Sequence, residues 1–291
     1  MLKDKDDWIN AGRITKEMLK KAEKIVQNGS YLIDVIEKLE KEFQPAFPIN
    51  VSMNEVAAHD TAEINDKRII EGVVKVDIGG LFNGAIGDSA ITLDLTDKYE
   101  HLLEANKEAL ENAIEFIKKQ KEEVKVSEIS KTIHDTAKKH KLGVILNLSG
   151  HGLEKNVIHS EPSIPNHYNT SSVKINKPKV FAIEPFFTLE DSLVMESGNA
   201  KIYQLISMKP LRDSKARKLL DYIHNKFSTR PFCTRWLTQE FKEDEITSGI
   251  RKLLLNSNLY AFKPLKNKNN DIVSQFEHTI IFDEETIVTT E

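Results

Sequence analysis

The sequence predicts a mixed α/β (α+β) protein in which amphipathic helices and short strands follow one another along a chain of 291 residues. Near the N-terminus, hydrophobic residues recur at three- and four-residue steps, which is the period of an amphipathic helix. Runs of β-branched residues such as Val73–Ile78 have the composition of strands instead. Hydrophobic residues make up 40% of the chain, so it can bury a sizeable core in one large domain or two smaller ones.

Residues 1–95 are predicted to form two helices and a hairpin. A helix over 6–27 ends at Asn28-Gly29, and Ser30 is expected to be the N-cap of a second helix that carries Leu32 and Leu39. Prolines at 45 and 48 favour an extended segment there. The strand Val73–Ile78 and a second strand at 90–95 predict a hairpin whose Gly- and Asn-rich connection is a long loop.

Residues 98–209 predict two further helices, at 98–120 and 127–141, and then strands at 144–148, 179–187 and 201–208. The segment 210–270 differs from the rest, because it predicts three helices around 219–227, 236–241 and 246–255. It holds 13 Lys and Arg residues against 6 Asp and Glu, a net charge of +7, which leaves −11 for the remainder of a chain whose total is −4. Two strands, at 271–282 and 286–290, are expected to close the fold.

The composition excludes several classes of protein. The single cysteine, Cys233, rules out a disulfide framework and a zinc site built on several thiolates. No apolar run is long enough to span a membrane, and the charged start MLKDKDDWIN lacks the core of a signal peptide. We therefore expect a cytoplasmic protein without a membrane partner. The nearly balanced charge argues against a mainly electrostatic nucleic-acid binder.

Five residues that could bind metal occupy positions where exposed polar side chains are not expected. They are Asp77, Asp88, His151, Glu184 and Glu277. A carboxylate within an apolar strand is costly to bury unless it is paired or binds a cation, and four carboxylates with one imidazole suit two divalent ions. Each residue alone has an ordinary interpretation as a turn residue, an edge-strand charge or an ion-pair partner. Spacing by itself does not show that the five converge.

The segments around these residues resemble the methionine aminopeptidases of type II, in their archaeal form. The resemblance covers nearly the whole chain and includes Phe47-Pro-Ile-Asn-Val-Ser-Met-Asn-Glu-Val-Ala-Ala-His59, Val76-Asp77-Ile-Gly, Gly87-Asp88-Ser-Ala, Gly150-His151, Ala182-Ile-Glu184-Pro-Phe, Pro231-Phe-Cys-Thr-Arg-Trp-Leu237 and Gln275-Phe-Glu277-His-Thr. The resemblance implies the pita-bread fold of aminopeptidases and creatinase, an antiparallel sheet covered by helices with the site in its cleft.

The resemblance also implies a role for each of the five residues. Two divalent ions are expected per chain, whose identity among Co, Mn, Fe, Zn and Ni the sequence leaves open. The residue matching Asp77 binds one ion, and those matching His151 and Glu184 bind the other. Those matching Asp88 and Glu277 bridge the two. A hydroxide shared by the ions would attack the scissile carbonyl, with the residue matching Glu184 as the proton shuttle.

Two more histidines and three apolar residues complete the expected site. Those matching His59 and His159 contact the substrate and stabilise the charge that grows in the transition state. Either could instead be an ordinary core or surface histidine. Phe47, Ile158 and Phe262 are expected to line the methionine pocket, although each is also plausible as a core residue.

The spacing of 93 residues from Glu184 to Glu277 matches the longer spacing of type II enzymes. We therefore assign 1–209 with 271–291 to the catalytic domain and 210–270 to a helical insertion that resembles a winged helix. The implied activity is removal of the initiator methionine from nascent chains whose second residue is small. A monomer is expected, with transient proximity to the ribosome and no direct nucleic-acid role.

Two alternatives remain open: an X-Pro aminopeptidase or prolidase of the same fold, and a non-catalytic homologue that binds other proteins.

The chain also departs from the type II pattern near the site. Asp60 follows His59 where Tyr is usual, and the run 152–157 lacks a common Tyr.

Overall fold

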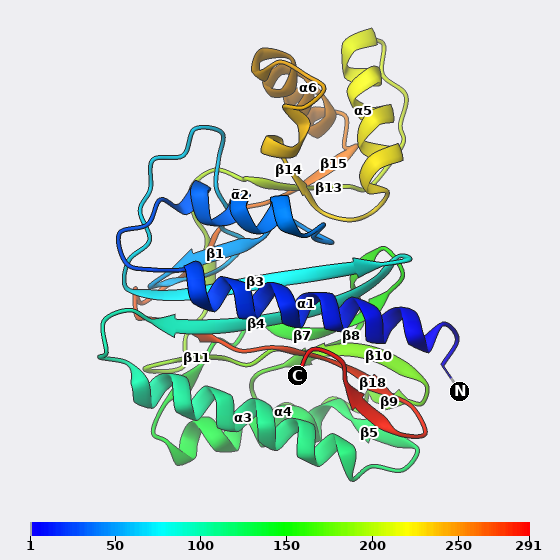
Figure 1. Ribbon diagram of the computed structural model, residues 1–291. Helices are drawn as coiled ribbons and strands as arrows, with labels where there is room; N and C mark the ends of the chain where they lie inside the picture. Colours follow the sequence, from blue (N-terminus) through cyan, green and yellow to red (C-terminus); the bar gives the residue numbers. More distant parts are fainter. Residues whose placement is uncertain (1) are drawn as a thin grey trace.

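The computed structural model describes residues 2–291, in which antiparallel sheets are covered by two pairs of helices (Figure 1). The helices are α1 (Lys5–Ile25), α2 (Leu32–Glu42), α3 (Glu100–Lys118), α4 (Val126–Lys139), α5 (Ser214–Phe227) and α6 (Glu243–Leu255), with a 3₁₀ helix η1 at Thr234–Leu237. The amphipathic periods of the sequence therefore predicted the six α-helices, whereas the helix expected around 236–241 is only the short 3₁₀ helix at Thr234–Leu237. The N-cap of α2 is Tyr31, however, and the expectation of Ser30 was wrong by one residue.

Two sheets form most of the centre of the molecule. The first has the order β1-β3-β4 and is built from β1 (Asn50–Met53), β3 (Val73–Phe82) and β4 (Ala85–Asp94). The second has the order β19-β18-β10-β7-β8 and is built from β7 (Ser149–Glu154), β8 (Val157–Pro165), β10 (Lys179–Ile183), β18 (His278–Phe282) and β19 (Thr286–Val288).

Four small sheets complete the structure. They are β17-β11-β6, β12-β16-β2, β14-β13-β15 and β5-β9, formed by β2 (Val56–Ala58), β5 (Glu123–Lys125), β6 (Gly143–Val144), β9 (Lys174–Asn176), β11 (Phe186–Thr188), β12 (Val194–Glu196), β13 (Ile202–Leu205), β14 (Phe232–Cys233), β15 (Leu259–Phe262), β16 (Leu265–Asn267) and β17 (Ser274–Gln275).

The hairpin β3–β4 corrects the expectation of a long loop. Both strands continue through the glycine-rich segment, and the turn consists of Asn83 and Gly84 alone, since Phe82 pairs with Ala85. The glycines of these strands allow α1 to pack closely on the hairpin, and they do not form a loop. A Cβ atom on Gly80 would lie 2.7 Å from the Ala11 carbonyl oxygen of α1. Helix α1 thus rests directly on this hairpin, as Figure 1 shows.

Other strands are shorter than predicted or were missed. The expected strand at 179–187 is broken between β10 and β11, where Pro185 follows Glu184. The strands predicted at 144–148 and 201–208 are shorter in the structure, where they correspond to β6 and β13. The hairpin β7–β8 was not predicted, because β8 contains Pro162 and ends at Pro165. Prolines are tolerated there since β8 is an edge strand of its sheet.

Each helix pair buries its apolar face against a different sheet. The core of α1 and α2 includes Met18 and Leu32 and packs on Val74 of β3. The core of α3 and α4 packs on Phe181 of β10 and Phe282 of β18. The site described below lies at the strands between these two cores.

Helices α5 and α6 stand together at one end of the molecule, above the sheet β14-β13-β15 (Figure 1). They share a separate apolar core with η1 that includes Leu219, Phe232 and Leu253. Strand β13 precedes residue 210 but pairs with β14 and β15 inside the helical segment. We use "insert" below for 202–262, the residues of this sheet and its helices. In the described part of the chain, no helix is long and apolar enough to cross a membrane.

Candidate metal centre and active-site cavity

The five residues expected to bind metal come from five separate places in the chain that the sheets bring together. Asp77 lies in the middle of β3 and Asp88 in the adjacent strand β4, where it faces Gly79 in the register. His151 lies in β7, and its partner in β10 is Ala182, two residues before Glu184. Glu277 lies between β17 and β18, and its main chain pairs with Ala90 of β4.

Two groups of possible ligands result, and Glu277 belongs to both. Ligand atoms of Asp88, His151 and Glu277 all lie within 4.8 Å of one another, as do those of Asp77, Glu184 and Glu277. His151 Nε2 is 3.6 Å from Asp88 Oδ2 and 3.9 Å from Glu277 Oε1. The membership of Glu277 in both groups fits a bridging ligand. Glu184 groups with Asp77 here instead of with His151, so the allocation of ligands to each ion stays a prediction.

The four carboxylates lack compensating charge from the protein. Glu277 is 1% and Asp88 3% exposed, and among residues 2–291 no Lys or Arg forms an ion pair with any of the four. Burial raises the pKa of Asp77 to about 7. Burial and the neighbouring carboxylates raise the pKa of Asp88, Glu184 and Glu277 well above their ordinary values.

This arrangement fits divalent cations. Among residues 2–291, the buried atoms Asp77 Oδ1 and Glu277 Oε1 find no hydrogen-bond partner, and cations would supply one. Burial lowers the pKa of His151 to about 3, so its imidazole is neutral and able to coordinate. Oxygen ligands with one imidazole suit Mn, Fe, Co or Zn, and their chemistry does not select one of these metals.

A cavity of about 710 Å³ opens onto the cluster and is lined by all ten residues expected at the site. His159 of β8 lies edge-on to His151, with 4.6 Å between ring centroids. His59 follows β2 and lies edge-on to Phe262, with 5.1 Å between centroids. Desolvation in the cavity lowers the pKa of the half-buried His59 to about 4 and also lowers the pKa of His159, although His159 is exposed at the cavity, so both rings are neutral near pH 7.

The three expected pocket walls come from both parts of the molecule. Phe47 precedes β1, and a Cβ atom on Gly79 would lie 2.2 Å from its ring, so the glycine leaves room for the phenyl group. Ile158 lies in β8 beside His159, and Phe262 ends β15 of the insert. The structure therefore places all three at the cavity, although each was equally plausible as a core residue.

Two residues close to the cluster were not singled out from the sequence. Gln275 donates a hydrogen bond from Nε2 to Glu184 Oε1 at 2.7 Å. Thr279 Oγ1 accepts a bond from the Asp88 amide at 2.7 Å and donates one to the Asp88 carbonyl at 2.8 Å. Both lie two residues from Glu277, and alternation along an extended strand is the signal that could have identified them.

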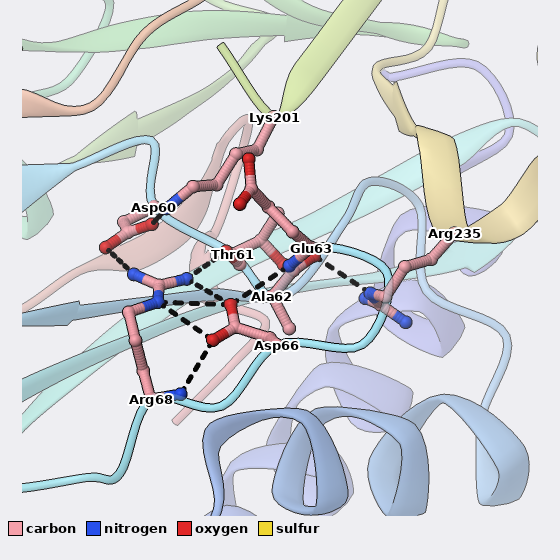
Figure 2. A network of polar contacts seen from close by, with 8 residues as sticks. All are labelled: Asp60, Thr61, Ala62, Glu63, Asp66, Arg68, Lys201 and Arg235. Atoms are coloured by element: carbon pink, nitrogen blue, oxygen red, sulfur yellow. Dashed lines mark hydrogen bonds and ion pairs between the residues drawn. The ribbon is translucent and has the colours of Figure 1, made fainter. Parts of the chain in front are cut away.

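Asp60, where the chain departs from the type II pattern, is buried and paired. Its carboxylate accepts from Arg68 Nη1 at 2.7 Å and from Lys201 Nζ at 2.6 Å. Figure 2 shows these two cations converging on Asp60 from opposite sides. Asp66 binds the same guanidinium, with 2.6 Å between Asp66 Oδ2 and Arg68 Nη2. A network of charges thus borders the loop that begins at His59.

Comparison with known sequences gives close relatives. Residues 8–210 match metallopeptidase family M24. The chain is 37% identical over 295 residues to a methionine aminopeptidase of Pyrococcus abyssi, with 99% of both chains covered. It is 38% identical over 287 residues to one from Archaeoglobus fulgidus, with 96% of both covered.

Comparison with solved structures confirms the expected pita-bread fold. A thermophilic Arx1 superposes with a TM-score of 0.83 at 17% identity, covering 99% of this chain and 91% of the other. Methionine aminopeptidase from Thermotoga maritima gives 0.68 at 21% identity, covering 98% and 96%. Prolidase from Pyrococcus furiosus gives 0.61 at 16% identity, covering 100% and 65%. At these identities, the likeness concerns the fold alone.

Proposed function

The chain belongs to metallopeptidase family M24 and is a methionyl aminopeptidase of the archaeal type II form, and we propose that it removes the N-terminal methionine from nascent proteins whose second residue is small. The observation that supports this proposal most is the cavity in which two overlapping groups of metal ligands face His59 and His159.

We propose that Asp77, Asp88, His151, Glu184 and Glu277 hold two divalent ions. Such ions would supply Lewis-acid activation of a water molecule and of the scissile carbonyl. Glu184 is half-buried at the cavity, and Gln275 fixes one of its carboxylate oxygens. Its other oxygen can take the proton of the attacking water and pass it to the departing amine.

His59 and His159 act on the substrate through their position and their neutral state. A neutral imidazole can donate a hydrogen bond to an oxygen that becomes negatively charged, or accept one from the substrate amine. Desolvation at the cavity lowers the pKa of both imidazoles, so both rings are neutral near pH 7. Phe47, Ile158 and Phe262 would surround the methionine side chain, whose flexible thioether adapts to such an apolar wall.

A peptide assay tests this proposal. Protein loaded with Mn or Co should cleave Met-Ala-Ser, leave X-Pro peptides intact, lose activity in EDTA and regain it when metal is restored. Cleavage of X-Pro peptides would favour a prolidase-type activity, because prolidases share the fold. No cleavage of any Met-peptide by a folded, metal-loaded sample would contradict the proposal and favour a non-catalytic binding protein.

The cellular setting is part of the same proposal. We place the enzyme in the cytoplasm, as a monomer that meets nascent chains close to the ribosome. The positive charge of 210–270 would support a weak attraction to the ribosome.

A further inference from the structure

The backbone of His59 lies in a conformation that non-glycine residues seldom adopt. Its φ angle is +63°, in the left-handed region. A strained residue of this kind persists only where its surroundings hold it, and such residues gather at functional sites. Its ring lines the cavity and is hydrogen-bonded to the main chain of Lys263, just past β15. The question is which contacts keep His59 in this conformation.

Each of the three residues after His59 has its carbonyl fixed by a hydrogen bond. The Asp60 carbonyl accepts from the Val51 amide of β1 at 2.8 Å. The Thr61 carbonyl accepts from Arg68 Nη2 at 2.7 Å. The Ala62 carbonyl accepts from Arg235 Nε at 3.0 Å. Two of the three donors are guanidinium groups, and hydrogen bonds from charged donors are the stronger kind.

The side chain of Asp60 adds the tightest constraint. It is only 8% exposed, and each of its oxygens is bonded to a different cation, Oδ2 to Arg68 and Oδ1 to Lys201. Lys201 Nζ is 2.6 Å away and its side chain is 13% exposed, so this pair is poorly screened by solvent. Removing one member of such a pair leaves a buried charge without its partner, which is strongly destabilising locally.

The cations that surround this loop are themselves anchored. Asp66 binds Arg68, and Glu40 of α2 binds Arg235 with both oxygens, at 2.7 and 2.9 Å. Figure 2 shows that Arg235 and Lys201 reach the loop from different segments of the chain. Arg235 comes from η1, and Lys201 immediately precedes β13, so both reach the loop from the insert or its first connection.

From these contacts we propose that Asp60 is a positioning residue, which together with Lys201 and Arg68 holds His59 in its left-handed conformation with the ring directed into the cavity. The network also ties this corner to the insert, so the insert takes part in turnover besides forming a pocket wall. The proposal rests on the function proposed above, because it assigns His59 a role in the transition state.

The Asp60→Asn variant tests the proposal, because the amide has the shape of the carboxylate but cannot pair with two cations. A displacement of about 1 Å in a catalytic group can lower turnover by about 100-fold. We expect kcat for Met-Ala-Ser to fall about 10- to 100-fold with KM changed less than about twofold, as for an interaction made only in the transition state. Asp191→Asn is the matched control. Asp191 pairs with Lys138 of α4 at 2.7 Å and accepts from the Val144 amide at 3.0 Å, and it is not among the residues that line the cavity, so its loss should affect stability alone.

A double-mutant cycle separates positioning from a general structural effect. In a His59→Ala background, Asp60→Asn should lower kcat by no more than about twofold, since its effect passes through His59. An equal loss of kcat in both backgrounds would overturn the proposal. If Asp60→Asn fails to fold, Lys201→Met removes the same ion pair through its more exposed partner. It should lower kcat in the wild-type background but hardly in the His59→Ala background.

A crystal structure of Asp60→Asn gives a readout that does not depend on activity. We expect the φ of His59 to leave the left-handed region or its ring to leave the cavity. If φ stays near +63° with the ring in place, Asp60 does not position His59, even if the enzyme cleaves Met-peptides. If the wild-type enzyme cleaves no Met-peptide, the proposed function fails, and the crystal structure still decides the role of Asp60.

Discussion

Gln275 donates its side-chain amide to Oε1 of Glu184 at 2.7 Å, across 91 residues of sequence. Gln275 also lowers the pKa of Asp77, against the larger rise caused by burial. One neutral donor therefore orients Glu184 and influences a second carboxylate of the candidate metal centre. Groups that orient metal ligands in this way contribute to metal affinity without touching the ion.

The Gln275→Leu variant should weaken metal binding by about 10- to 100-fold, the usual effect of removing a hydrogen bond to a ligand. Leucine has nearly the same volume, so the change mainly removes the donor. Calorimetric titration of the metal-free protein with Mn would measure the loss. Gln120→Leu is the control, because within the described part of the chain the Gln120 side chain donates only to the Phe116 carbonyl in the last turn of α3. Unchanged affinity in Gln275→Leu would show that Gln275 does not orient the ligands.

Glu184→Gln should lower kcat by at least about 100-fold while the protein remains folded. The amide keeps the shape of the side chain but cannot accept and release the proton, and general acid–base catalysis contributes about 10²- to 10⁴-fold. Circular dichroism would establish folding, and metal analysis would show whether ions are retained. Full turnover by a metal-loaded Glu184→Gln sample would exclude Glu184 as the proton carrier.

The ion pair between Asp66 and Arg68 should make the free energy of unfolding depend on pH in the acidic range. Burial alone would raise the pKa of Asp66, but hydrogen bonds from Arg68 outweigh it and lower the pKa from 3.8 to about 2. A carboxyl whose pKa is lower in the folded state stabilises the protein above its unfolded pKa, and this contribution is lost as the pH falls towards the folded value.

Urea unfolding of wild type and Asp66→Asn would measure this contribution. The difference in unfolding free energy should be greatest at pH 6 and should shrink between about pH 4 and about pH 2, the interval bounded by the two pKa values. A difference that stays constant over this interval would show that the carboxylate charge of Asp66 does not stabilise the fold.

Gly87→Ala should lower both stability and metal affinity. A Cβ atom at this position would lie 2.6 Å from the Gly12 nitrogen and 2.7 Å from the Ala11 carbonyl carbon, and neither main-chain atom can move without shifting α1. Overpacking of this kind costs about 1–3 kcal/mol. The displaced strand would carry Asp88, the next residue, away from its ligand position.

Gly249→Ala is the matched control for Gly87→Ala. Its added methyl group would lie 2.4 Å from Cδ2 of Leu219, the end of a side chain that can rotate away, and alanine favours the helix by about 1 kcal/mol. Thermal unfolding should therefore separate the two variants by several degrees. Equal melting temperatures would show that α1 can move away from the hairpin at little cost.

The candidate site could be predicted from the sequence because its ligands stand in short motifs with characteristic neighbours. Spacing alone did not show that Asp77 and Glu277 meet, since that depends on strand pairing across 200 residues of sequence. The continuation of β3 through Gly79 and Gly80 was also unpredictable. Glycine usually interrupts a strand, and the reason for it here is the approach of α1, which only the folded molecule reveals.

The charges around Asp60 were beyond sequence analysis for a similar reason. The aspartate was visible as a departure from the family pattern, but its partner Lys201 lies 141 residues away. A buried aspartate is unfavourable until its cations are in place, so a local pattern gives no sign of the network. The strands β7 and β8 were missed because prolines and small residues hide the period of a strand.

The walls proposed for the methionine pocket belong to two units with separate cores. Phe47 and Ile158 are fixed to the sheets that carry the metal ligands, whereas Phe262 and Ile202 face each other across β15 and β13 of the insert. The shape of the pocket can therefore be altered by changing the insert while the metal centre stays intact. Inhibitor design gains the same freedom: one group could bind the metals, and a second group, directed at Phe262, could distinguish enzymes that differ in this segment.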